Sequence, residues 1–124
     1  MKISSAFLFA LPATLARCQQ PPTELRSYTL STVDATNQYV EIWKKHIESL
    51  KEFNVTTRAV WTPEGNDKQV MALVQYAIGD DPADVDAAYR ASEAFTNNMV
   101  GFNLSNFESV VSTVLNPTLF SPVL

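Results

Sequence analysis

His46 is the only histidine in this 124-residue chain and the side chain best suited to exchange protons near neutral pH. It lies between Trp43 and Leu50, in a segment whose apolar residues recur every three or four positions, so on a helix it shares their apolar face. A polar ring there must hydrogen-bond or line a cavity, because burying it unpaired is costly. Two interpretations stay open: a structural core histidine, or a catalytic acid or base in a pocket.

Aromatic and hydrogen-bonding side chains elsewhere in the chain could complete such a pocket. Two tryptophans and four tyrosines can stack on a flat ligand, although they can also form an ordinary core, which is the better interpretation for Trp43 and Tyr89. The residues predicted to bind a ligand are Tyr28, Arg58, Trp61 and Tyr76.

Two arginines could supply the cation for an anionic or phenolate-like group. Strand alternation places Arg26 on the same face as Tyr28, and it places Arg58 on the face opposite Trp61. The edge of a sheet, or a seam between two copies of the chain, is the alternative position for either arginine.

Several kinds of chemistry have no basis in this sequence. The three glycines form neither G-x-G-x-x-G nor a P-loop, and the G-x-S-x-G serine motif is absent. A single histidine and the lack of a retained cysteine leave only oxygen ligands for a metal. The acidic run from Asp80 to Asp86 lacks the spacing of a calcium loop, and helix capping explains it. We therefore predict no cofactor and no metal.

Composition bounds the chain to one domain and narrows its partners. It is 46% hydrophobic and 18% charged, with a formal net charge of -4 and a pI near 4.8. The acidic balance argues against binding to nucleic acid or to an anionic membrane surface.

Residues 1–18 have the pattern of a cleaved secretory signal peptide. Lys2 precedes an apolar stretch of about 14 residues, whereas a membrane span needs about 20. Cleavage after Ala16 or after Cys18 would fit, and a frayed apolar helix or a retained anchor is the alternative. We expect a secreted or lumenal protein without stable membrane association, whose single domain is residues 19–124.

Two N-x-S/T triplets agree with secretion and predict glycosylation of Asn54 and Asn103, whereas Pro117 excludes the triplet at Asn116. Cys18 has no partner for an internal disulfide. The fold must therefore depend on its core and on association.

Hydrophobic periodicity predicts four strands and two helices. Alternating or continuous apolar segments indicate strands at 25–32, 56–62, 69–77 and 107–115. Apolar stripes indicate a helix over 34–53, with Asn54 left-handed beyond its end, and a second helix that starts at Pro82 and whose stripe continues to Met99. An extended tail follows from Asn116.

This order, βαββαβ, is the ferredoxin-like α+β plan: a four-stranded antiparallel sheet with both helices on one face. In that plan the third strand is central, and its Val70 to Val74 segment is apolar at odd and even positions alike. The helices can cover only one of its faces. We therefore expect a homodimer in which two sheets pack together as a dimeric α+β barrel.

Short motifs along the mature chain resemble the NIPSNAP family of dimeric α+β barrels. They are Glu24 to Leu30, the helix with Trp43, Val60-Trp61-Thr62, and Leu115 to Pro122. Many members have glycine where this chain has Asn54. The family has no settled reaction, and related barrels include cofactor-independent oxygenases, decarboxylases, cyclases and non-catalytic proteins, so the resemblance alone does not choose among them.

Two functional hypotheses follow. In the first, the protein binds a small hydrophobic or aromatic, polyketide-like molecule and transforms it, if at all, without a cofactor, as an oxygenase, isomerase or cyclase would. His46 would then be the acid or base. In the second, the protein is a non-catalytic NIPSNAP-type stress or interaction protein, and His46 is structural.

Overall fold

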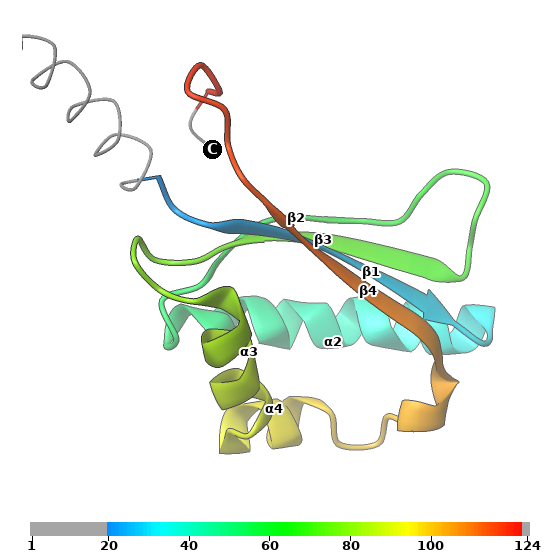
Figure 1. The fold of residues 1–124 in the computed structure, drawn as a ribbon. Coiled ribbons are helices and arrows are strands. Elements are labelled where there is room, and N and C mark those ends of the chain that lie inside the picture. The colour runs from blue at the N-terminus through cyan, green and yellow to red at the C-terminus, as the bar shows by residue number, and fades with distance from the viewer. Residues whose placement is uncertain (1–19, 123–124) are drawn as a thin grey trace, which may run out of the picture.

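The computed structural model describes residues 20–122 and contains one four-stranded antiparallel sheet. The strands β1 (Thr23–Leu30), β2 (Thr56–Trp61), β3 (Gln69–Gln75) and β4 (Phe107–Leu115) lie in the order β2-β3-β1-β4. The helices α2 (Val33–Lys51), α3 (Pro82–Arg90) and α4 (Glu93–Asn98) lie on one side of this sheet, and the short 3-10 helix η1 (Leu104–Asn106) leads into β4 (Figure 1). This arrangement confirms the predicted ferredoxin-like fold, with β1 and β3 at the centre.

Helix α2 forms close to where its sequence predicts. Thr32 is the N-cap, and its Oγ1 accepts a hydrogen bond from the Ala35 amide at 3.0 Å. Strand β1 ends at Leu30, two residues before the predicted strand end. Thr32 does not extend the strand because it caps the helix. Beyond the helix, Asn54 has a φ of 60°, which confirms the predicted left-handed residue.

The second helical segment is two short helices, and the prediction of one continuous stripe to Met99 is wrong. Helix α3 ends at Arg90, and Ser92 caps α4 by accepting the Phe95 amide at 3.2 Å. The Ser92 hydroxyl also donates to the Tyr89 carbonyl at 2.6 Å. A serine that bonds the backbone on both sides favours a cap over a helix interior, which explains the break.

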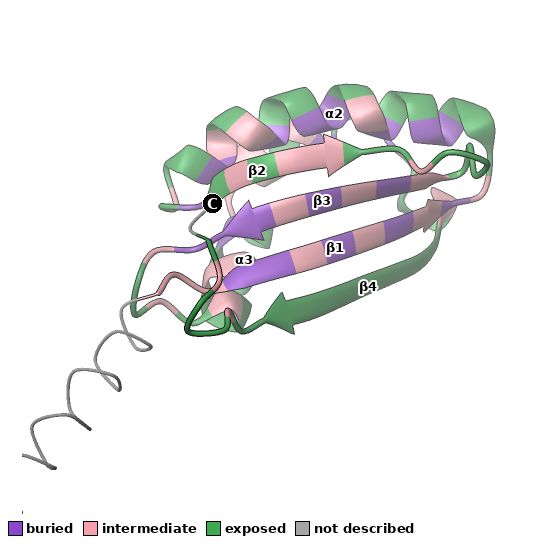
Figure 2. Ribbon diagram, turned by 90° about the horizontal axis from the view of Figure 1, so that it is seen from above, coloured by how far each residue is buried: buried purple, intermediate pink, exposed green. Residues whose placement is uncertain are grey.

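The two faces of the sheet are buried to different extents (Figure 2). On the helix face, Tyr28 and Leu30 of β1 and alternate residues of β3 are buried. On the outer face, Leu25, Met71 and Leu73 are only half-buried, Trp61 is 47% exposed and Val111 is 54% exposed. A single chain therefore covers one face of the apolar strand β3 and leaves the other partly open.

The predicted signal peptide, residues 1–18, lies outside the described residues. Within residues 20–122, no helix combines the length and the apolar character that a membrane crossing requires.

Candidate functional site

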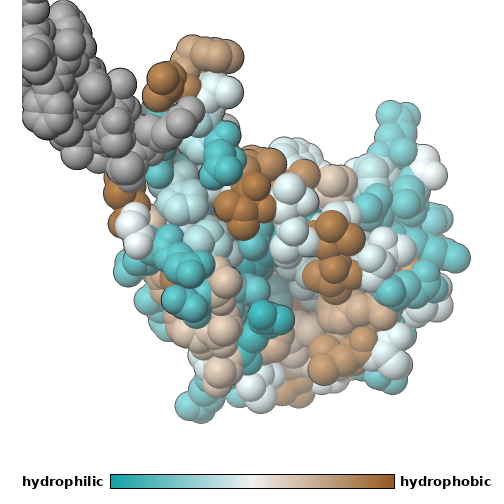
Figure 3. Space-filling view, viewed as in Figure 1, coloured by the Kyte–Doolittle hydropathy of each residue, from teal (hydrophilic) through white to brown (hydrophobic). Residues whose placement is uncertain are grey.

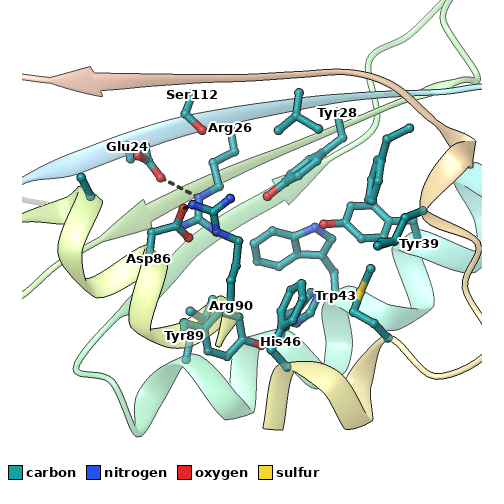
Figure 4. A pocket seen from close by; sticks show the side chains of 17 residues that line it. Glu24, Arg26, Tyr28, Tyr39, Trp43, His46, Asp86, Tyr89, Arg90 and Ser112 are labelled. Atoms are coloured by element: carbon teal, nitrogen blue, oxygen red, sulfur yellow. Dashed lines mark hydrogen bonds and ion pairs between the residues drawn. The ribbon is translucent and has the colours of Figure 1, made fainter. Parts of the chain in front are cut away.

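A cavity of about 660 Å³ lies between the helix face of the sheet and the helices that cover it. Side chains of β1 and β4 line one wall, and side chains of α2, α3 and α4 line the other (Figure 4). In the space-filling view the surface is hollowed between clusters of apolar side chains (Figure 3). Val110 and Ser112 of the edge strand β4 line this cavity and are exposed.

Aromatic rings form one end of the cavity. The Tyr28 and Tyr39 ring centroids are 4.9 Å apart in an edge-to-face arrangement, and Tyr39 meets Phe107 at the same distance. The Trp43 ring lies 6.1 Å from Tyr28. Burial raises the pKa of Tyr28 and raises that of Tyr39 well above its usual value, so both hydroxyls stay protonated at neutral pH.

His46 projects from α2 into the same space and is 2% exposed. Its Nδ1 lies 2.5 Å from the Tyr89 hydroxyl, and its ring stacks on Phe95 at 5.6 Å. Burial, with the positive charge of Arg26 as a second cause, lowers the pKa of His46 to about 4, so the ring is neutral at pH 7. Its Nε2 is buried and has no hydrogen-bond partner among residues 20–122.

A buried ion cluster around Arg26 forms the other end of the cavity. The Arg26 Nε contacts Glu24 Oε1 at 2.6 Å, and Nη2 contacts the Tyr76 hydroxyl at 2.7 Å and Asp86 Oδ1 at 2.9 Å. The Tyr76 hydroxyl donates to Glu24 at 2.9 Å. Asp86 also pairs with the exposed Arg90 at 3.3 Å, so two carboxylates face two guanidinium groups (Figure 4).

Arg26 stays charged because its neighbours compensate for its burial. Burial alone would lower the pKa of Arg26, but Tyr28, Tyr76, Asp86 and Glu24 together raise it above its usual value. Burial raises the pKa of Tyr76, which keeps its hydroxyl a donor. The Arg26 to Asp86 contact joins β1 to α3, so the same interaction makes this end of the cavity polar and ties a covering helix to the sheet.

The structure brings only some of the predicted site residues together. Tyr28 and His46 line the cavity, and Tyr76 stands behind Arg26 through its hydroxyl. Trp61 lies on the outer face of the sheet, opposite the cavity, because it pairs with Met71.

Arg58 is also on the outer face, so the alternation that placed it opposite Trp61 is wrong. It donates to Gln75 Oε1 from Nε at 3.1 Å and from Nη2 at 2.7 Å, and Gln75 shares the face of Met71. A register shift between Thr57 and Ala59 inserts one extra residue in β2. Such a bulge changes the side on which the following residues lie.

Sequence reasoning did not assign Glu24, Asp86 or Phe95 to the site. Asp86 belongs to the acidic run that helix capping explains, but the residue that caps α3 is Asp81, whose Oδ1 accepts a hydrogen bond from the Ala83 amide at 3.0 Å. Asp86 is four residues past the first helical position and half-buried, a place where an uncompensated carboxylate needs a cation. That position is the sequence feature that could have identified Asp86 as a site residue.

The two predicted glycan acceptors, Asn54 and Asn103, are exposed. Asn103 also orders its own loop, because its Oδ1 accepts hydrogen bonds from the Ser105 amide and hydroxyl at 3.0 and 2.8 Å. Within residues 20–122 no group of three or more histidine, cysteine or acidic side chains is placed to hold a metal ion.

Comparisons with known proteins place this geometry in a family. The NIPSNAP family model matches residues 23–122. A NIPSNAP family protein with unknown function from Agrobacterium tumefaciens is 18% identical, with a TM-score of 0.68, over 86% of this chain and 96% of that one. An uncharacterized NIPSNAP-like domain protein from Burkholderia xenovorans is 19% identical, with the same TM-score, over 86% and 92% of the two chains.

The fold extends beyond that family. A putative antibiotic biosynthesis monooxygenase from Bacteroides thetaiotaomicron is 15% identical, with a TM-score of 0.57, over 86% of this chain and 96% of that one. At these identities the likeness concerns the fold alone. No curated protein sequence matches this chain.

Removing the buried cation should destabilise the folded protein. We expect Arg26→Met to lower the free energy of unfolding by about 3–5 kcal/mol, because it leaves the buried Glu24 carboxylate without its cation. Arg90→Met removes an arginine of the same cluster that is exposed, and it should cost about 1 kcal/mol or less. Urea denaturation measures both, and equal losses would contradict the central role of Arg26.

Protonation of His46 should lower the stability of the folded protein as the pH falls. The pKa of His46 is about 4 in the folded protein and near 6.5 when unfolded, so the unfolded state binds the proton first. The free energy of unfolding should therefore drop by up to about 3 kcal/mol between pH 6.5 and pH 4. His46→Gln should flatten that part of the profile, and an unchanged slope in this variant would assign the effect to other groups.

Proposed function

Because this chain belongs to the NIPSNAP family and its ferredoxin-like fold encloses an aromatic cavity, we propose that it binds a small hydrophobic or aromatic, polyketide-like molecule in that cavity. The observation that carries this proposal is the unpartnered Nε2 of His46. A buried polar atom without a partner is costly, and a ligand in the cavity would supply one.

The size and lining of the cavity support the same ligand class. About 660 Å³ is within the range of small-molecule sites, which combine apolar walls with a few polar groups. Here the rings of Tyr28, Tyr39 and Trp43 offer flat surfaces for stacking, and Arg26 with its carboxylate partners makes the other end polar.

Transformation of the ligand is a further part of the proposal. One protein of the same fold is a putative antibiotic biosynthesis monooxygenase. If the bound molecule reacts, the expected class is cofactor-independent oxygenation, isomerisation or cyclisation. A ligand that binds and is recovered unchanged would favour the alternative, a non-catalytic protein.

We also propose that two copies pair through the outer faces of their sheets. The half-buried Leu25, Met71 and Leu73, with the exposed Trp61 and Val111, make that face apolar across all four strands. An antiparallel sheet face of this kind is normally packed against another layer. A second copy of the same face is self-complementary and would complete the predicted barrel.

We also propose a secretory location for this protein. It rests on the leader-like residues 1–18 and on the exposure of both acceptor asparagines, Asn54 and Asn103.

Filling the cavity should abolish ligand binding while sparing the fold. Ser112 lines the cavity from an exposed position on β4, so Ser112→Phe should occupy space without disturbing the core. We expect aromatic and polyketide-like compounds that stabilise the wild-type protein in thermal-shift and calorimetric assays to lose at least tenfold in affinity. Asn97→Phe, on the exposed side of α4, is the matched control. Equal binding by both variants would place the ligand elsewhere.

The oligomeric state should change only when a substitution lies on the outer face of the sheet. Val111 and Val114 lie on the same strand with comparable exposure, but Val111 pairs with Ser27 on the outer face and Val114 pairs with Glu24 on the helix face. We expect sedimentation to show a dimer for the wild-type protein and for Val114→Lys, and a monomer for Val111→Lys, because a buried unpaired lysine opposes association. A wild-type monomer would refute the pairing.

A further inference from the structure

Three side chains from three helices form a hydrogen-bonded chain that ends on His46. The Asn98 Nδ2 of α4 lies 3.3 Å from the Tyr89 hydroxyl of α3, and that hydroxyl lies 2.5 Å from the His46 Nδ1 of α2. Asn98 Nδ2 also donates to Ser49 Oγ at 2.8 Å. Figure 4 shows the Tyr89 hydroxyl directed at the imidazole ring.

The direction of this chain follows from what each group can donate. An amide nitrogen only donates, so Tyr89 accepts a hydrogen bond from Asn98 and keeps its own proton to give away. Burial raises the pKa of Tyr89, so that proton is present at neutral pH. His46 Nδ1 is the acceptor that the Tyr89 hydroxyl meets at hydrogen-bond distance.

A neutral imidazole carries one proton, and an accepting Nδ1 leaves that proton on Nε2. Nε2 is one of three buried side-chain nitrogen or oxygen atoms without a hydrogen-bond partner among residues 20–122, and its ring lines the cavity. Trp43, which lines the same cavity, supplies another through its Nε1. The ring cannot turn freely, since it stacks on Phe95 at an interplanar angle of 12° and meets Trp43 edge-on at 5.4 Å.

We infer that His46 offers a fixed Nε2–H donor to the cavity, and that the ligand is a flat aromatic compound with a carbonyl or phenolate oxygen that accepts it. This inference rests on the proposed function and names the ligand class of the same cavity. The Arg26 guanidinium in the cavity wall is already paired with Glu24 and Asp86, so the imidazole N–H is the donor that selects this oxygen. In this state His46 has no lone pair on Nε2, so it is a hydrogen-bond donor and not a general base.

The tautomer can be measured in the protein without any ligand. His46 is the only histidine, so protein labelled with 15N-histidine and purified without a histidine tag gives one pair of ring nitrogen signals. We expect the proton on Nε2 at pH 7. Tyr89→Phe removes the donor to Nδ1 and should shift the tautomer ratio towards Nδ1–H. A wild-type ring protonated on Nδ1, as a reversed Asn98 amide would produce, overturns the inference whatever the cavity binds.

The ligand class is tested with a matched pair of probes, 1-tetralone and tetralin, which differ in one ring carbonyl. The measured quantity is the ratio of their affinities by calorimetry. We expect His46→Phe, which keeps an aromatic ring but has no donor, to reduce the preference for 1-tetralone by about three- to tenfold, the worth of one hydrogen bond. His46→Gln keeps an N–H donor and should retain part of the preference.

The two proposals can fail separately. An unchanged ratio in a folded His46→Phe that still binds both probes would overturn the donor role while leaving ligand binding intact. Failure of both probes to bind a wild-type protein whose proton is on Nε2 would overturn this ligand class and count against the proposed function, although the tautomer would stand.

Discussion

The buried guanidinium of Arg26 is the interaction on which much of this structure depends. Taking a charge out of water is expensive, so its position is acceptable only where Glu24, Tyr76 and Asp86 compensate it. Glu24 belongs to β1 and Asp86 to α3, and Tyr76 directly follows β3. One buried charge therefore fixes how α3 docks against the sheet and makes one end of the cavity polar. Burial lowers the pKa of His46 at the centre, and the Arg26 charge lowers it further.

The break between α3 and α4 has an equally direct consequence for the cavity. Because Ser92 ends one helix and caps the next, the chain turns between Tyr89 and Phe95. Both rings then reach His46, Tyr89 through its hydroxyl at 2.5 Å and Phe95 by stacking. A continuous helix would place its side chains in one straight stripe, so the turn is what surrounds the imidazole on two sides.

Periodicity predicted the order of the helices and strands and which residues share a face of each one. The apolar spacing around Trp43 placed His46 on the covered side of α2, and alternation placed Arg26 beside Tyr28, as the structure has them. Alternation predicted the wrong face for Arg58, because a bulge in β2 adds one residue and so interrupts the two-residue repeat. It also could not choose between the two arginines, since both were acceptable on local grounds.

By itself, the sequence determined the ferredoxin-like element order, the burial of the one histidine and the absence of familiar nucleotide or serine motifs, because these follow from residue types and short-range spacing. Only the tertiary structure decided which groups meet. Arg26 reaches Tyr76 and Asp86 across 50 and 60 residues of chain, and His46 reaches Tyr89 across 43. Such pairs depend on how the helices dock on the sheet, and local patterns contain no record of that docking.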